Sequence, residues 1–120
     1  MAGPLAGIRV IDLSTMVSEP LSTALLADQG AELIKVEPSG GDIARRTAGN
    51  GGFTAGFVSC NRGKRSLALE LKQSAAVELL RRLITSADVL VQNSKNCSLR
   101  INSTAWSSIR ARSSRMSAGV

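Results

Sequence analysis

Two short apolar runs flank a Leu- and Ala-rich stretch near the start of the chain. The runs cover residues 8–13 and 33–36, and the stretch between them begins near Pro20 and ends at Gly30. Proline suits the first turn of a helix because its missing N–H would be unpaired there, and glycine readily takes the left-handed conformation that ends a helix. Both runs are nearly continuous and rich in β-branched residues, as in parallel strands that are covered on both faces. The pattern predicts a right-handed strand–helix–strand unit.

Further elements follow the same logic. Residues 53–59 predict a short helix or an extended lead-in, and residues 67–71 predict a third strand. Residues 74–84 predict an amphipathic helix whose buried face carries Ala76, Leu79, Leu80 and Leu83. A fourth strand is expected at residues 89–91. This order predicts an α/β fold, half of a doubly wound sheet with flanking helices.

In such sheets ligands gather at the carboxyl ends of the strands, which here means residues 14–19 and the turn after Glu37. A nucleotide-like ligand is therefore the first hypothesis. An acidic residue that closes the second strand, as Glu37 does, is typical of NAD-binding folds, whose first loop reads G-x-G-x-x-G. Residues 14–20 contain no glycine, which disfavours dinucleotide binding of that type.

The net charge of +6 is concentrated in the second half of the chain. A basic half is compatible with nucleic acid, a membrane surface or a phosphorylated small molecule. The aromatic residues Phe53, Phe57 and Trp106 form no stacking pattern, so no nucleic-acid partner is expected. Two basic segments remain candidates for phosphate contacts, Arg45 with Arg46 and a predicted loop at residues 60–66. Solvated charge is the plainer interpretation of the arginine pair, whereas for the loop both interpretations stay open.

Other residue types narrow the chemistry. No apolar run reaches the roughly 20 residues that span a bilayer, and no leader pattern opens the chain, so we expect a cytoplasmic protein without a membrane anchor. Cys60 and Cys97 lack metal-ligand spacing, and histidine is absent, so we expect reduced structural thiols and no metal. Residues 94–120 are basic, rich in serine and without apolar period, which suggests one domain at residues 1–93 and a degenerate tail at 94–120.

Five ordered segments, residues 3–14, 20–38, 40–45, 61–72 and 87–93, resemble the N-terminal part of the class III CoA-transferases, the formyl-CoA transferase type. That family includes the α-methylacyl-CoA racemases. The resemblance implies a Rossmann-like large domain that binds coenzyme A, and a homodimer whose subunits interlink. It also implies transfer of CoA between an acyl-CoA and a carboxylic acid through an aspartyl-CoA thioester.

The resemblance also implies a set of CoA-binding residues. The loop after the first strand would lie by the CoA thiol end, and the later positions would hold the nucleotide and pantetheine: Met16, Val17 and Ser18 in the loop, then Asn61, Arg62, Lys64, Arg65 and Asn93. Two departures stand out. Glu19 replaces the family's usual glycine, and residues 94–97 replace its F-x-P-G segment.

By the same resemblance, the catalytic aspartate and the racemases' acid and base would lie beyond Val120. We therefore assign no catalytic residue and expect an N-terminal fragment that is inactive by itself. Three alternatives stay open: a non-catalytic binding or interaction module, a functionless truncated product, and an acyl-CoA racemase within the family.

Overall fold

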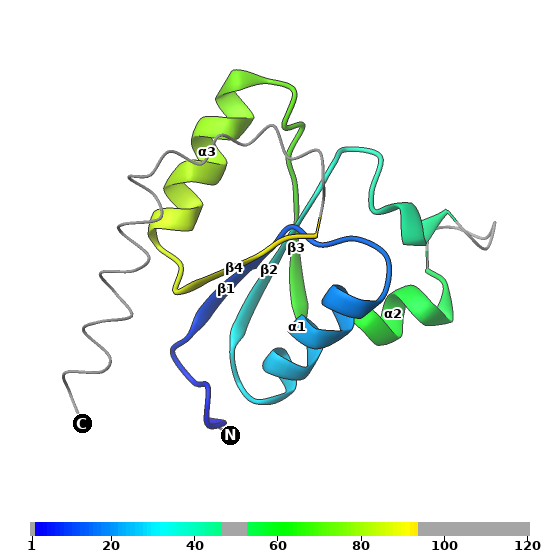
Figure 1. Cartoon of the computed structure of the whole chain (residues 1–120), viewed down its shortest axis with the longest axis vertical. Coiled ribbons are helices and arrows are strands. Elements are labelled where there is room, and N and C mark those ends of the chain that lie inside the picture. Colours follow the sequence, from blue (N-terminus) through cyan, green and yellow to red (C-terminus); the bar gives the residue numbers. More distant parts are fainter. Residues whose placement is uncertain (1, 47–52, 94–120) are drawn as a thin grey trace.

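A four-stranded parallel sheet forms the centre of the computed structural model, which describes residues 2–46 and 53–93 (Figure 1). The strand order is β3-β2-β1-β4. The strands are β1 (Arg9–Asp12), β2 (Glu32–Glu37), β3 (Lys64–Ala68) and β4 (Val89–Val91). All three neighbouring pairs are parallel. The predicted α/β fold with a mostly parallel sheet is confirmed.

Helices cover both faces of this sheet (Figure 1). The helical elements are α1 (Ser18–Asp28), a 3₁₀ turn (Ile43–Arg45), α2 (Ala55–Asn61) and α3 (Ser74–Thr85). Helices α1 and α2 lie on one face and α3 lies on the other. Successive strand residues point to opposite faces, so each strand contributes to two apolar layers. This explains why β1 and β2 read as nearly continuous apolar runs.

The two layers can be followed in β1. Val10 packs with Leu33 of β2 on the face that α1 covers. Ile11 points the other way and packs against Leu80 and Ile84 of α3. All five side chains are buried, and the sheet therefore has a hydrophobic core on each side.

Helix boundaries differ in detail from the predictions. α1 begins at Ser18, so Pro20 lies inside its first turn, and Gly30 follows the helix with the expected positive φ of 99°. The segment 53–59 is helical from Ala55, with the Thr54 side chain accepting a hydrogen bond from the Phe57 N–H. Thr54 thus supplies an N-cap.

The predicted start of the third strand is wrong. β3 begins at Lys64, which pairs in register with Leu33, so residues 64–66 of the segment expected to be a basic loop are strand. Strand propensity disfavours lysine, but the Lys64 ammonium finds a buried carboxylate partner, Asp12. Tertiary pairing therefore overrides the local preference.

The predicted buried face of α3 is also partly wrong. Ala76 and Leu80 are buried, but Leu79 is 54% exposed, and Ile84 takes a buried position instead. The helix is rotated so that its core contacts run through positions 76, 80 and 84, one turn apart. Cys97, Trp106 and the rest of the tail at 94–120 lie outside the described residues.

Candidate functional site

The direction in which strands are added to the sheet reverses between β1 and β4. The chain steps from β1 to β2 and β3 on one side, then returns through α3 to place β4 on the other side of β1. In open α/β sheets this switch point, at the carboxyl ends of the strands, is where ligands bind. Here it is bounded by residues 13–17, which we call the β1 loop, and by Gln92 and Asn93 after β4.

Asn93 ties the two sides of the switch point together. Its Oδ1 accepts a hydrogen bond from the Thr15 N–H at 3.0 Å, and its Nδ2 donates to the Thr15 carbonyl at 2.9 Å. The same Nδ2 donates to Glu19 Oε2 at 3.0 Å. Beyond this contact, Met16 has a φ of +72°, and Met16 and Val17 are about half exposed. The β1 loop therefore offers two apolar side chains to solvent at the ligand edge.

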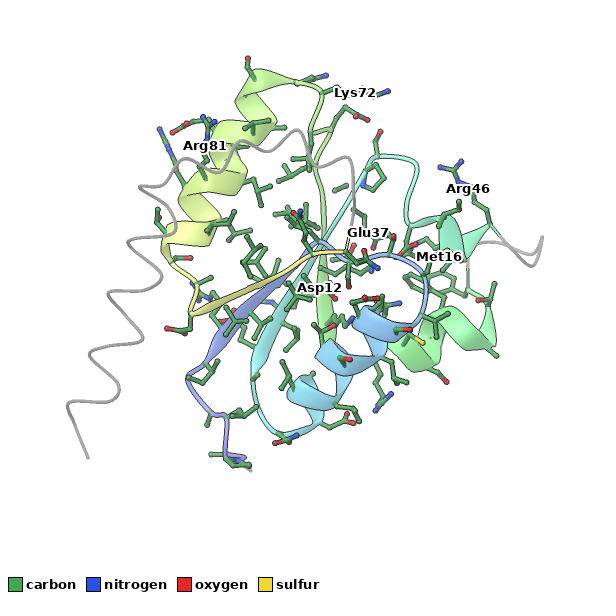
Figure 2. The ribbon with its side chains drawn as sticks, in the orientation of Figure 1. Asp12, Met16, Glu37, Arg46, Lys72 and Arg81 are labelled. Atoms are coloured by element: carbon green, nitrogen blue, oxygen red, sulfur yellow. The ribbon has the colours of Figure 1, made fainter. Side chains whose placement is uncertain are left out.

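Asp12, the last residue of β1, holds the start of the β1 loop by hydrogen bonds (Figure 2). Its Oδ1 accepts from the Ser14 N–H at 2.8 Å and from the Ser14 hydroxyl, while its Oδ2 accepts from Thr23 Oγ1 and Lys64 Nζ, both at 2.7 Å. Burial by itself raises the pKa of this carboxyl, but hydrogen bonds from Lys64, Ser14 and Thr23 and the Lys64 charge outweigh it, so the pKa lies below its ordinary value. Asp12 stays ionised and is saturated with donors.

The Lys64 ammonium also has all its hydrogen-bonding groups in use. Besides Asp12, its ammonium donates to the Pro20 carbonyl at 2.8 Å and to Asn61 Oδ1 at 3.1 Å, which uses all three of its N–H groups. Burial lowers the Lys64 pKa, and the hydrogen bond and charge of Asp12 oppose that fall. Lys64 therefore connects β3 to the first turn of α1.

Lys35 of β2 provides a second buried cation under the β1 loop. Its Nζ donates to the Ser14 carbonyl at 2.9 Å and lies 2.8 Å from Asp42 Oδ2. Sequence reasoning missed Asp12 and Lys35 as site residues. The signal was present, since a charged residue inside a strand that is covered on both faces needs a buried partner.

The Glu37 carboxylate, at the end of β2, accepts hydrogen bonds from other residues of the chain. Arg45 donates to both of its carboxylate oxygens at 2.8 Å, and the Asp42 N–H and Ser66 hydroxyl donate at 2.9 Å. The paired Arg45 hydrogen bond is the largest cause that lowers the Glu37 pKa to about 2. The Arg45 guanidinium also lies 4.0 Å from the centre of the Phe57 ring. Glu37 is thus not free to hold a ribose, and the partly exposed Arg45 guanidinium would have to give up Glu37 to bind a phosphate.

The structure divides the residues predicted to bind CoA into separate groups. It brings Met16, Val17 and Ser18 together with Asn93 at the switch point. A second group lies around α2 and β3, comprising Asn61, Arg62, Lys64 and Arg65. All four line a cavity of about 350 Å³ whose walls also include Phe53, Phe57 and Val58.

Arg62 and Arg65 form ion pairs within the chain. Arg62 pairs with Asp28 at 2.6 Å on the molecular surface. Arg65 points to the face opposite Lys64, because adjacent strand residues alternate, and pairs with Glu32 at 2.6 Å. Lys64 and Arg65 both border the cavity beside α2, but their cationic groups pair with different carboxylates, and a contact from Lys64 to CoA would require it to exchange a present partner.

Within 2–46 and 53–93, no group of three or more His, Cys, Asp or Glu side chains could hold a metal ion. In the same part of the chain, no helix has the length and apolar character that a bilayer crossing requires.

A family model described as CoA-transferase family III matches residues 5–116. The chain belongs to this family. The match extends past Asn93, where the recognisable sequence motifs end, into the segment that we expected to be degenerate. The resemblance inferred from the sequence is confirmed.

Several family III proteins are similar to this chain. A succinate–glutarate CoA-transferase of Agrobacterium fabrum is 39% identical over 116 residues, which cover 89% of this chain and 29% of that protein. The β subunit of a succinyl-CoA–L-malate CoA-transferase of Chloroflexus aurantiacus is 40% identical over 106 residues, covering 86% of this chain and 26% of that subunit. The crystal structure of a CAIB/BAIF family protein from Brucella suis superimposes with a TM-score of 0.76 at 36% identity, covering 92% of this chain and 31% of that one. The family III chain described here thus spans less than a third of the length of these relatives.

Proposed function

We propose that this family III chain forms part of the Rossmann-like CoA-binding domain of an enzyme that transfers CoA from an acyl-CoA to a carboxylic acid. The family match over residues 5–116 carries this proposal. The transfer would proceed through an aspartyl-CoA thioester in a homodimer, as the family resemblance implies. Relatives named for succinate–glutarate, succinyl-CoA–malate and succinyl-CoA–mesaconate transfer suggest a dicarboxylic acid as the acyl group.

The switch point is the proposed place for the thiol end of CoA. Met16 and Val17 are exposed there, and apolar side chains suit the pantetheine arm. Asn93 lies beside them, at the end of β4. The geometry supports the predicted contribution of this group better than that of Lys64 and Arg65, whose charges are already paired.

Two other cations are better placed for the CoA phosphates. Arg46 follows β2 and Lys72 follows β3, both beyond the carboxyl ends of these strands. Both are exposed, both make no ion pair within the described part of the chain, and Figure 2 shows them on the outside of the molecule. An unpaired exposed guanidinium and ammonium can meet phosphate oxygens without breaking existing contacts.

We further propose that these 120 residues do not catalyse transfer by themselves. A carboxylate that forms a thioester must be accessible and free to attack. The buried carboxylates Asp12 and Glu37 are each saturated by four protein donors. Neither can reach an acyl-CoA without dismantling the end of the sheet.

Calorimetric titration of the folded chain with CoA tests the proposal, with circular dichroism to establish folding. We expect saturable binding that weakens by roughly tenfold or more when Arg46 and Lys72 are both replaced by Ala, because two charge-assisted contacts are lost. The matched control is Arg81→Ala with Arg82→Ala, which removes the same number of cations from α3. A folded chain that ignores CoA would contradict the proposal and favour an interaction module, and equal weakening by both pairs would refute the assignment of the phosphate contacts.

A further inference from the structure

The Asn93 carboxamide has no hydrogen left for a ligand. An amide side chain offers two N–H groups, and both are used, one by the Thr15 carbonyl at 2.9 Å and one by Glu19 Oε2 at 3.0 Å. Its oxygen faces the Thr15 N–H at 3.0 Å. Donors face acceptors at all three contacts, so the orientation of the amide is fixed.

The carboxamide pairs with both backbone groups of Thr15, as the backbone of a neighbouring strand would. Pairing between β1 and β4 ends with the Leu13 N–H donating to the Val91 carbonyl at 2.8 Å, and Asn93 continues it with its side chain. The β1 loop is therefore fastened to β4 immediately before Met16, whose φ of +72° an L-residue rarely adopts.

Glu19 completes the contact from the first turn of α1. Its carboxylate accepts the second Nδ2 hydrogen of Asn93, and so prevents the amide from rotating to present its oxygen to the Thr15 carbonyl. Glu19 is half-buried and acidic at the helix N-terminal turn, where the helix dipole favours a negative charge. The contact thus links β1, α1 and β4 through one side chain.

We infer that Asn93 and Glu19 are positioning residues, which hold the β1 loop in the shape that receives the thiol end of CoA, rather than direct ligands of CoA. This inference rests on the proposed function for the identity of the ligand. It changes the role that the family resemblance implies for Asn93, and it gives a role to Glu19, where the family usually has glycine.

The test compares CoA with adenosine 3′,5′-bisphosphate, which has the nucleotide end of CoA and no pantetheine arm. Asn93→Asp keeps the shape of the side chain, removes both donors and places a carboxylate against Glu19 and the Thr15 carbonyl. We expect CoA affinity to fall about tenfold or more, because two half-buried acceptors lose their donor, while affinity for the bisphosphate changes less than about twofold. Gln29→Glu makes the same amide-to-carboxylate change on an exposed residue at the far end of α1 and should alter neither affinity.

Two further variants make the result independent of any loss of folding. Glu19→Ala removes one contact of Asn93 and should weaken CoA binding by a few-fold, again without affecting the bisphosphate. In Asn93→Asp with Glu19→Gln, the new amide can donate to Asp at position 93, so part of the CoA affinity should return. Equal losses for both ligands, or no loss for CoA in any of these variants, would overturn the inference.

Hydrogen exchange at the Thr15 amide separates this inference from the proposed function. If the unmutated chain binds no CoA, the proposed function fails, but the positioning contact is still measurable without ligand. Asn93→Ala removes the Oδ1 that accepts from the Thr15 N–H, so it should speed exchange of that N–H by about tenfold or more, and Gln29→Ala, at the exposed far end of α1, should not. Unchanged Thr15 exchange in Asn93→Ala would overturn the positioning role, whatever the ligand is.

Discussion

Replacing Glu37 by Gln should destabilise the chain at neutral pH and remove much of its sensitivity to acid. Glu37 is buried, and its carboxylate accepts two hydrogen bonds from Arg45 and one each from the Asp42 N–H and the Ser66 hydroxyl. These contacts lower its pKa from 4.5 to about 2. Since a shift of one pKa unit corresponds to about 1.4 kcal/mol, the ionised Glu37 carboxylate contributes about 3 kcal/mol to the free energy of unfolding.

The direction of the pH dependence follows from the lowered pKa. The unfolded chain binds a proton at Glu37 near pH 4.5, whereas the folded chain does so only near pH 2. The contribution is therefore fully present above pH 4.5 and is lost progressively as the pH falls from there to about 2. At pH 7 the Gln variant also leaves Arg45 with a neutral partner in place of its carboxylate.

Urea unfolding followed by circular dichroism, at pH values from 7 down to 3, measures this effect. The difference in unfolding free energy between the unmutated chain and Glu37→Gln should be about 3 kcal/mol at pH 7 and should shrink steadily below pH 4.5. Glu78→Gln is the control, because Glu78 is exposed and contacts arginines only on the surface of α3. A Glu37→Gln difference that stays constant from pH 7 to pH 3 would refute the reasoning.

Lys64→Met should lower the free energy of unfolding by about 3–5 kcal/mol, because Asp12 is left as a buried charge without its cation. Adding Asp12→Asn should recover part of that loss, and no recovery in the double variant would show that the ion pair is not the cause. Gly30→Ala should lower the free energy of unfolding by more than about 1 kcal/mol in the same urea assay, because its φ is +99° and an added Cβ would lie 2.8 Å from the Gly3 backbone nitrogen. An unchanged urea midpoint would contradict that backbone geometry. Leu80→Ala should lower the free energy of unfolding by about 2–5 kcal/mol and Leu79→Ala by less than about 1 kcal/mol, because Leu80 is fully buried and Leu79 is 54% exposed. Similar losses in the two variants would mean that α3 is oriented differently.

The fold was predictable because apolar runs and helix-ending residues repeat along the chain. Gly30 marked the end of α1, and the short run at residues 89–91 marked β4. The errors lie where distant residues override local preference. Lys64 belongs to a strand because Asp12, far away in the sequence, supplies its partner, and no local pattern contains that information.

The candidate site was predictable in outline only. The position of the β1 loop followed from strand order and from the family resemblance, and the structure brings that loop together with Asn93. Which cations are free could not be read from the sequence, because Lys64 and Arg65 are adjacent residues whose side chains leave opposite faces of a strand. Arg46 and Lys72 gave no stronger sequence signal, yet they are exposed and unpaired within the described part of the chain.

The measurement that most directly tests the central claim is a chemical-shift map of the isotopically labelled chain during titration with CoA. The account predicts saturable changes at the switch point, centred on the amides of the β1 loop and of Asn93, with further changes near Arg46 and Lys72. Changes confined to the cavity beside α2, or no saturable change in a folded chain, would contradict the claim that CoA binds across the carboxyl ends of these strands.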